Sequence, residues 1–137
     1  MVRNISFLHL TFLIVISLVM VDSCFAATAA DLNQSKQQIF ALIQSGDYAG
    51  ADTATNKLIA DFNNSSGIDE TIQQIAEKYR ITKNYPKAIE LSRYVIANRP
   101  QSNRAVWSQM EIVMSNMLLG NEESAPTGIT TLLANYS

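Results

Sequence analysis

The sequence has very little of what enzymes use for covalent or metal chemistry. Among its 137 residues there is one cysteine, Cys24, and one histidine, His9. After residue 24 the chain has no Cys or His. It therefore cannot form a serine–histidine or cysteine–histidine nucleophile arrangement there, or a zinc site made of Cys and His. A single cysteine also forms no internal disulfide, so packing alone has to stabilise an exported domain.

An excess of charge of one sign is also missing. The chain has ten Lys and Arg against twelve Asp and Glu, a net charge of −2, and this value is unchanged when Arg3 and Asp22 are left out. Nucleic-acid binding needs a basic footprint, and binding to anionic lipid needs a polybasic patch. We therefore expect no nucleic-acid partner.

The only candidates for acid–base chemistry are two adjacent pairs of carboxylates, Asp69–Glu70 and Glu122–Glu123. Such pairs are more often found in the first turn of a helix, where they complement the positive end of its dipole. We expect no catalysis, no metal ion and no small-molecule cofactor.

The N-terminal segment has the pattern of an export signal. Arg3 precedes the apolar run "ISFLHLTFLIVISLVMV" (5–21), and the small-residue tract "SCFAATAA" follows. This order predicts a secretory signal peptide that is cleaved after Ala26 or Ala29. The expected domains are a signal peptide at 1–26 and a periplasmic or extracellular domain at 27–137.

Two alternatives to cleavage stay open. The apolar run is at the short limit for a membrane span, so the segment can instead be an anchor that tethers the domain to a membrane. The residues "VDSC" also resemble the lipobox of bacterial lipoproteins, in which Cys24 carries the lipid, although Asp22 fits that motif poorly.

After residue 30 the pattern is helical, and no segment has the alternation typical of a strand. Asp31 with Gln34 predicts a capping box for the first helix, and Asp47 after Gly46 predicts the start of the second. Six helices are expected: 32–44, 48–62, 69–82, one between Pro86 and Pro100, 102–119, and one that ends in "TTLLANYS".

A short motif occurs three times at an interval of 37 residues, as "KLIADFN" (57–63), "YVIANRP" (94–100) and "TLLANYS" (131–137). Helical hairpins that repeat every 20 to 50 residues or so are typical of a helical solenoid. The same interval aligns Ala51, Ala88 and Ala125. Two helices approach closely only at small side chains, so we expect these alanines to be buried.

Residues 69–102 carry a finer pattern of large, small and aromatic positions: Ile72, Ile75, Ala76, Tyr79, Ala88, Ser92, Val95 and Pro100. This spacing resembles the tetratricopeptide repeat, a helix-turn-helix of about 34 residues. The flanking units match less well, with Gln38 and Gln109 at apolar positions and Pro126 in the first turn of the last helix. The resemblance implies an all-α, right-handed α-solenoid of about three helix-turn-helix repeats. Its hairpins are expected at about 31–65, 66–102 and 103–137.

The resemblance also implies a binding groove, because the first helix of each tetratricopeptide unit lines a groove from its second, fifth, ninth and twelfth positions. Here those positions are Glu70, Gln73, Glu77 and Arg80 in the matched unit, and Arg104, Trp107, Glu111 and Met114 in the next. The partner-binding residues we select are Glu70, Gln73, Glu77, Arg80, Trp107, Glu111 and Met114. For the polar members the alternative is an ordinary solvated helix face.

The expected fifth helix is rich in methionine. We assign Val106, Met110, Val113 and Met117 to the core, whereas Trp107, Met114 and Leu118 lie toward another face. Methionine-rich and exposed apolar surfaces commonly contact partners.

The last helix has no polar cap; its final stripe consists of Ile129, Leu132, Leu133 and Tyr136. A solenoid normally ends in a polar capping helix. Either the repeats continue in a longer protein, which we favour, or this helix mediates self-association.

The resemblance implies an exported protein–protein interaction scaffold that binds a peptide or protein in its groove, as envelope tetratricopeptide proteins do. We expect Trp107→Ala or Arg80→Glu to weaken binding while the domain stays folded. The alternatives are the repeat region of a longer exported enzyme, such as a peptidase or cell-wall hydrolase, and an envelope lipoprotein adaptor of the outer-membrane assembly type.

Overall fold

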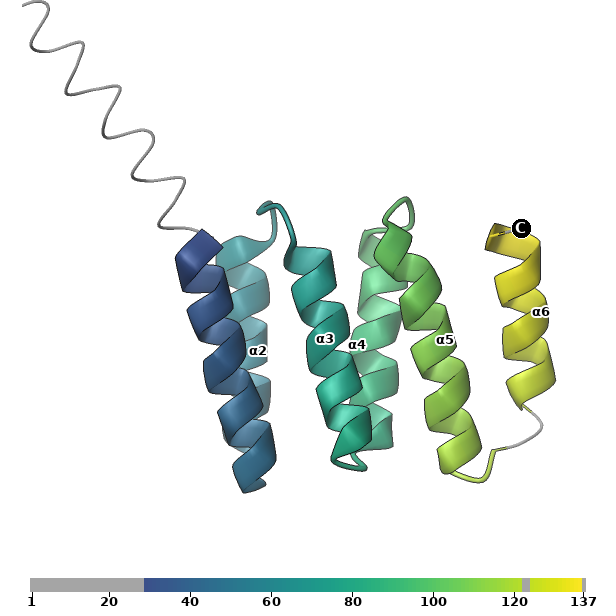
Figure 1. Ribbon diagram of the computed structural model, residues 1–137, viewed down its shortest axis with the longest axis horizontal. Helices are drawn as coiled ribbons and strands as arrows, with labels where there is room; N and C mark the ends of the chain where they lie inside the picture. The colour runs from purple at the N-terminus through teal and green to yellow at the C-terminus, as the bar shows by residue number, and fades with distance from the viewer. Residues whose placement is uncertain (1–28, 122–123, 137) are drawn as a thin grey trace, which may run out of the picture. The chain divides into compact units, whose positions relative to one another are not determined.

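The computed structural model describes residues 29–121 and 124–136 (Figure 1). The expected signal peptide, including Cys24, lies outside the described residues, and so do Glu122 and Glu123. The chain divides after Asp31, and the residues from Leu32 onward form one compact unit.

Every secondary-structure element among the described residues is an α-helix, which confirms the all-α prediction. The first helix covers 29–45. It is followed by α2 (Tyr48–Phe62), α3 (Ile68–Ile81), α4 (Tyr85–Asn98), α5 (Asn103–Leu118) and α6 (Ser124–Tyr136). None of the described helices is both long enough and apolar enough to cross a membrane.

Local signals set most of these boundaries. Gly46 has a φ of +81°, a left-handed conformation that glycine adopts without strain, and it ends the first helix. Asp47 then caps α2 by accepting a hydrogen bond from the Gly50 amide at 2.9 Å, as predicted. The capping box at Asp31 is a wrong prediction, because the first helix already includes residues 29 and 30.

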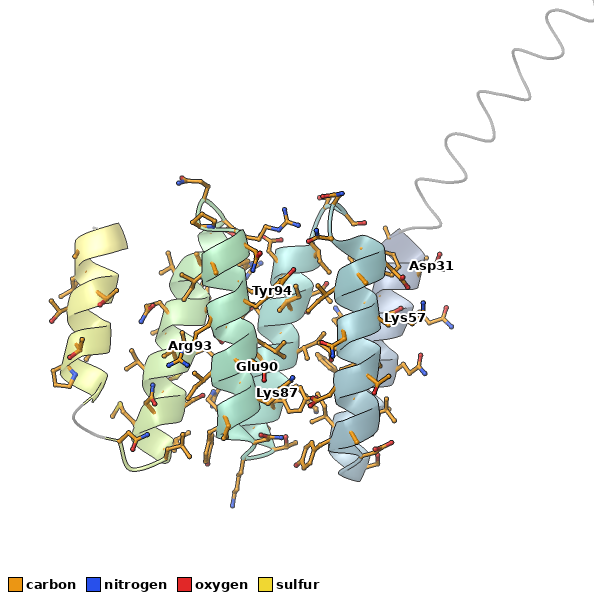
Figure 2. All side chains as sticks on the ribbon, turned by 180° about the vertical axis from the view of Figure 1, so that it is seen from behind. Asp31, Lys57, Lys87, Glu90, Arg93 and Tyr94 are labelled. Carbon is orange, nitrogen blue, oxygen red and sulfur yellow. The ribbon has the colours of Figure 1, made fainter. Side chains whose placement is uncertain are left out.

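The helices of the compact unit lie in two layers. The first helix, α3 and α5 lie side by side, with α2 and α4 behind them in Figure 1 and in front of them in Figure 2. Each helix from α3 to α5 packs against the next one in the chain, and α3 also contacts α5. Consecutive helices thus pack in pairs, as an all-α repeat fold requires.

The hydrophobic core is centred on the first four helices. Ala51 and Ala88 are fully buried, as the repeat predicted, whereas the Ala125 side chain lies outside the described residues. The middle unit buries seven of its eight pattern positions: Ile72, Ile75, Ala76, Tyr79, Ala88, Ser92 and Val95. Each large apolar side chain buried in this way stabilises the fold by roughly 1.5–3 kcal/mol.

The face of α5 that is buried differs from the prediction. Val113 is buried and Val106 is half-buried, but Met110 and Met117 are 44% and 53% exposed, so their assignment to the core is wrong. Apart from Val113, the buried residues of α5 are small or polar: Ala105, Ser108, Glu111 and Ser115. Small side chains let α5 pack closely against its neighbours α3 and α4, and Met110 and Met117 lie on its exposed side.

Candidate functional site

A groove of about 430 Å³ lies between α3 and α5. The wall that comes from α3 consists of polar side chains. The wall that comes from α5 consists largely of tryptophan and methionine side chains. The residues that line this α3–α5 groove are Gln73, Gln74, Glu77 and Arg80 of α3, and Arg104, Trp107, Met110, Glu111 and Met114 of α5.

The groove brings together most of the residues that the sequence selected. Those that line it are Gln73, Glu77, Arg80, Trp107, Glu111 and Met114. Glu70 is not among the lining residues; its carboxylate forms an ion pair with Arg104 at 2.8 Å. The selection missed Gln74, Met110 and Arg104, the last of which had been named as a groove position but not selected. Helical spacing could have identified Met110, because it lies three residues after Trp107 and four before Met114.

The α5 wall is an apolar surface that water can reach. Trp107 is 54% exposed, Met110 is exposed and Met114 is half-buried. Their spacing of three and four residues places all three side chains on one face of the helix. Met side chains are flexible and polarisable, so this wall can adapt its shape to an apolar ligand group.

The α3 wall is fixed by hydrogen bonds that extend to neighbouring helices. Lys36 of the first helix donates a hydrogen bond to Gln74 Oε1 at 3.0 Å, and Gln74 Nε2 donates to Glu70 Oε1 at 3.2 Å. At the start of α5, the Ser102 hydroxyl donates to Asp69 of α3 and caps α5 by accepting from the Arg104 amide. Asp69 and Glu70 lie in the first turn of α3, as expected. These contacts hold the two walls in register.

A half-buried ion pair joins the two walls of the groove. Arg80 Nε lies 2.7 Å from Glu111 Oε1, and the Glu111 side chain is almost completely buried. The Arg80 Nε–H has no aligned hydrogen-bond acceptor, so this contact is an ion pair rather than a hydrogen bond. Ser115 donates its hydroxyl to the same Glu111 oxygen at 3.3 Å. Arg80 is also 3.8 Å from Glu77.

Burial raises the pKa of the Glu111 carboxyl above its ordinary value of 4.5, and the attraction of Arg80 only partly opposes the rise. Removing one partner of a buried ion pair leaves an uncompensated charge. Arg80→Glu would moreover place a carboxylate against Glu111. We therefore expect this substitution to disturb the fold as well as any binding, so Trp107→Ala is the cleaner test of the groove.

The groups that line the groove can make non-covalent contacts of several kinds. Within residues 29–121 and 124–136, no three His, Cys, Asp or Glu side chains cluster in a way that could hold a metal ion. The groove offers an apolar wall, side-chain amides that both donate and accept hydrogen bonds, and charges already paired across two helices. Such groups suit the recognition of a polypeptide segment.

No protein-family model matches the chain, and the search of curated proteins found no match. The resemblance to the tetratricopeptide repeat therefore depends on the residue pattern alone.

Proposed function

We propose that this protein is an exported scaffold of the tetratricopeptide type, which binds a peptide segment of a partner protein in the α3–α5 groove and performs no catalysis. One observation carries the proposal: Trp107, the chain's only tryptophan, is exposed beside Met110 and Met114 in a groove whose other wall is polar. Tryptophan is among the residues most enriched at energetically dominant positions of protein interfaces.

The dimensions of the groove support a peptide as the ligand. A volume of about 430 Å³ accommodates a few side chains but not the surface of a folded domain. The Gln74 amide uses one oxygen lone pair with Lys36 and one N–H with Glu70, so its second lone pair and second N–H can pair with the backbone of an extended peptide. Affinity then comes from the apolar wall, and orientation comes from the polar one.

The test begins with peptides selected from a random display library on the full-length chain, with affinities measured by calorimetry. We expect Trp107→Ala to weaken binding of the selected peptides by about tenfold or more, because it removes the largest apolar contact. Met110→Ala should weaken binding by a smaller factor.

Met117→Ala is the matched control, since Met117 is also an exposed methionine of α5 but does not line the groove. It should leave affinity unchanged. Circular dichroism of each variant verifies that the helices remain folded. The proposal is wrong if Met117→Ala weakens binding as much as Met110→Ala does, or if Trp107→Ala has no effect on any selected peptide.

A further inference from the structure

The α3–α5 groove is lined by a cation, Arg104, where its two helices begin, and by a carboxylate, Glu77, further along. At the end where α3 and α5 begin, Glu70 forms an ion pair with Arg104, and its oxygen accepts from Gln74, to which Lys36 donates. Glu70 thus pairs directly with Arg104, whereas Lys36 is connected to it only through the Gln74 amide. The Arg104 guanidinium has five N–H donors, so it can bind a further carboxylate beside Glu70.

At the other end, two carboxylates surround one cation. The Arg80 guanidinium lies 2.7 Å from the Glu111 carboxylate but 3.8 Å from the Glu77 carboxylate, so it interacts more strongly with Glu111. The Glu77 side chain is 46% exposed and faces the groove. It is the carboxylate that an incoming cation can reach.

The two charged ends are separated by a distance that a short peptide spans. Glu70 and Glu77 are seven residues apart on α3, and Arg104 and Glu111 are seven apart on α5. Both helices run in the same direction (Figure 1). Seven residues of helix correspond to a rise of about 10 Å, which about three residues of extended peptide cover. Trp107 lies between the two ends.

We propose, as an extension of the proposed function, that the occupant of the groove is an extended segment of a partner protein with three features. These are an acidic residue bound by Arg104, a basic residue bound by Glu77, and an apolar residue between them against Trp107. Complementary charges fix orientation and exclude wrong partners more than they add affinity. A wholly acidic segment is repelled at Glu77, and a wholly basic one is repelled at Arg104.

The test uses four end-blocked peptides that share a central leucine and carry acidic–basic, basic–acidic, acidic–acidic or basic–basic flanks. Binding to the full-length chain is followed by the emission of Trp107, which shifts to shorter wavelength as the indole leaves water. One of the two opposite-charge peptides should bind about fivefold more tightly than either like-charge peptide. Added salt should reduce this preference, because the charges are near the surface.

Two substitutions test which residue binds the acidic and which binds the basic side chain of the peptide. Glu77→Gln should abolish the discrimination against the acidic–acidic peptide, and Arg104→Gln should abolish that against the basic–basic peptide. Glu90→Gln and Arg93→Gln are the matched controls, since both are exposed on α4 in the other layer (Figure 2) and should change neither preference.

The outcomes separate the two proposals. If all four peptides shift the emission with equal affinity, or if a like-charge peptide binds best, the charge order is wrong while the groove remains a peptide site. If none of the four shifts the emission at about 1 mM, a concentration that reveals even weak binding, both proposals are wrong.

Discussion

At the scale of single residues, α5 is joined to the protein by polar groups that give little stability. Ser108, Glu111 and Ser115 are buried where a core helix normally places apolar side chains. The Ser108 hydroxyl is buried without a hydrogen-bond partner, which costs roughly 1–3 kcal/mol. Ser115, by contrast, donates to Glu111.

This difference gives a matched pair of substitutions. Ser108→Ala should raise the free energy of unfolding by about 1 kcal/mol, because it removes an unpaired polar group and favours the helix. Ser115→Ala should lower it, because Glu111 loses a donor. Urea unfolding of the full chain measures both. If Ser108→Ala destabilises the protein as much as Ser115→Ala, the buried hydroxyl has a partner after all.

The raised pKa of Glu111 predicts how stability depends on pH. The folded chain keeps this proton to higher pH than the unfolded chain, so above about pH 4.5 the folded state binds more protons. The contribution of Glu111 to stability therefore falls as the pH rises from 4.5 through the raised pKa.

Relative to Glu111→Gln, the unaltered protein should lose stability as the pH rises above about 4.5, as measured by urea unfolding at several pH values. Glu90→Gln, which removes an exposed carboxylate paired with Lys87, serves as the control for the loss of one acidic group. If the free energy of unfolding of the unaltered protein stays constant or rises with pH relative to that of Glu111→Gln, Glu111 is not buried as described.

At the scale of helices, α6 is positioned on α5 by a close approach at a glycine. A Cβ atom at Gly128 would lie 2.5 Å from Val113 Cγ2, so the two helices contact each other where the side chain is missing. Helix propensity alone favours alanine over glycine in a helix interior by roughly 0.8–1 kcal/mol. Overpacking acts in the opposite direction and costs roughly 1–3 kcal/mol.

We therefore expect Gly128→Ala to loosen α6 from α5 although it favours the isolated helix. Limited proteolysis within α6 should be faster in this variant. The double variant Gly128→Ala/Val113→Ala removes the clashing methyl group and should recover much of the protection. Slower proteolysis in Gly128→Ala alone would show that the two helices are not in close contact at this position.

The sequence predicted helix boundaries better than it predicted which face of a helix is buried. Gly46, Asp47 and Pro100 act locally, through backbone conformation and capping, so their effects could be predicted without the rest of the chain. The orientation of α5 depends instead on which residues permit close packing. Apolar character predicted that Met110 and Met117 belong to the core, but the buried positions of α5 are occupied by small residues such as Ala105 and Ser108.

At the scale of the whole molecule, the interval of 37 residues was the most informative feature of the sequence. It led to the paired helices and to the buried Ala51 and Ala88, whereas most of the residues that line the groove came from the resemblance to the tetratricopeptide repeat. The ion pair between Arg80 and Glu111 was not predicted. These residues are 31 positions apart on different helices, and a charge pair of that kind leaves no periodic signal in a sequence.

The core itself is unevenly distributed along the stack of helices. Its main cluster of buried apolar residues extends from the first helix to α4: Leu32, Ile39, Ile43, Ala51, Leu58, Ile68, Ile72, Ile75, Ala76, Tyr79, Ala88, Leu91 and Val95. No residue of α5 or of the described part of α6 belongs to it. Repeat proteins gain stability from each unit and from its contacts with the neighbouring units, so their ends can open separately.

We expect the α5–α6 hairpin to open before the rest of the protein. In native-state hydrogen exchange, its amides should exchange with an opening free energy about 2 kcal/mol below that of α3 and α4, or roughly thirtyfold faster. Val113→Ala should lower protection only in α5 and α6, because Val113 lies outside the main cluster. Leu58→Ala should instead lower protection in α2, α3 and α4 by removing a buried side chain of that cluster. Equal opening free energies in all helices would mean that the polar interface of α5 is as cohesive as the apolar core.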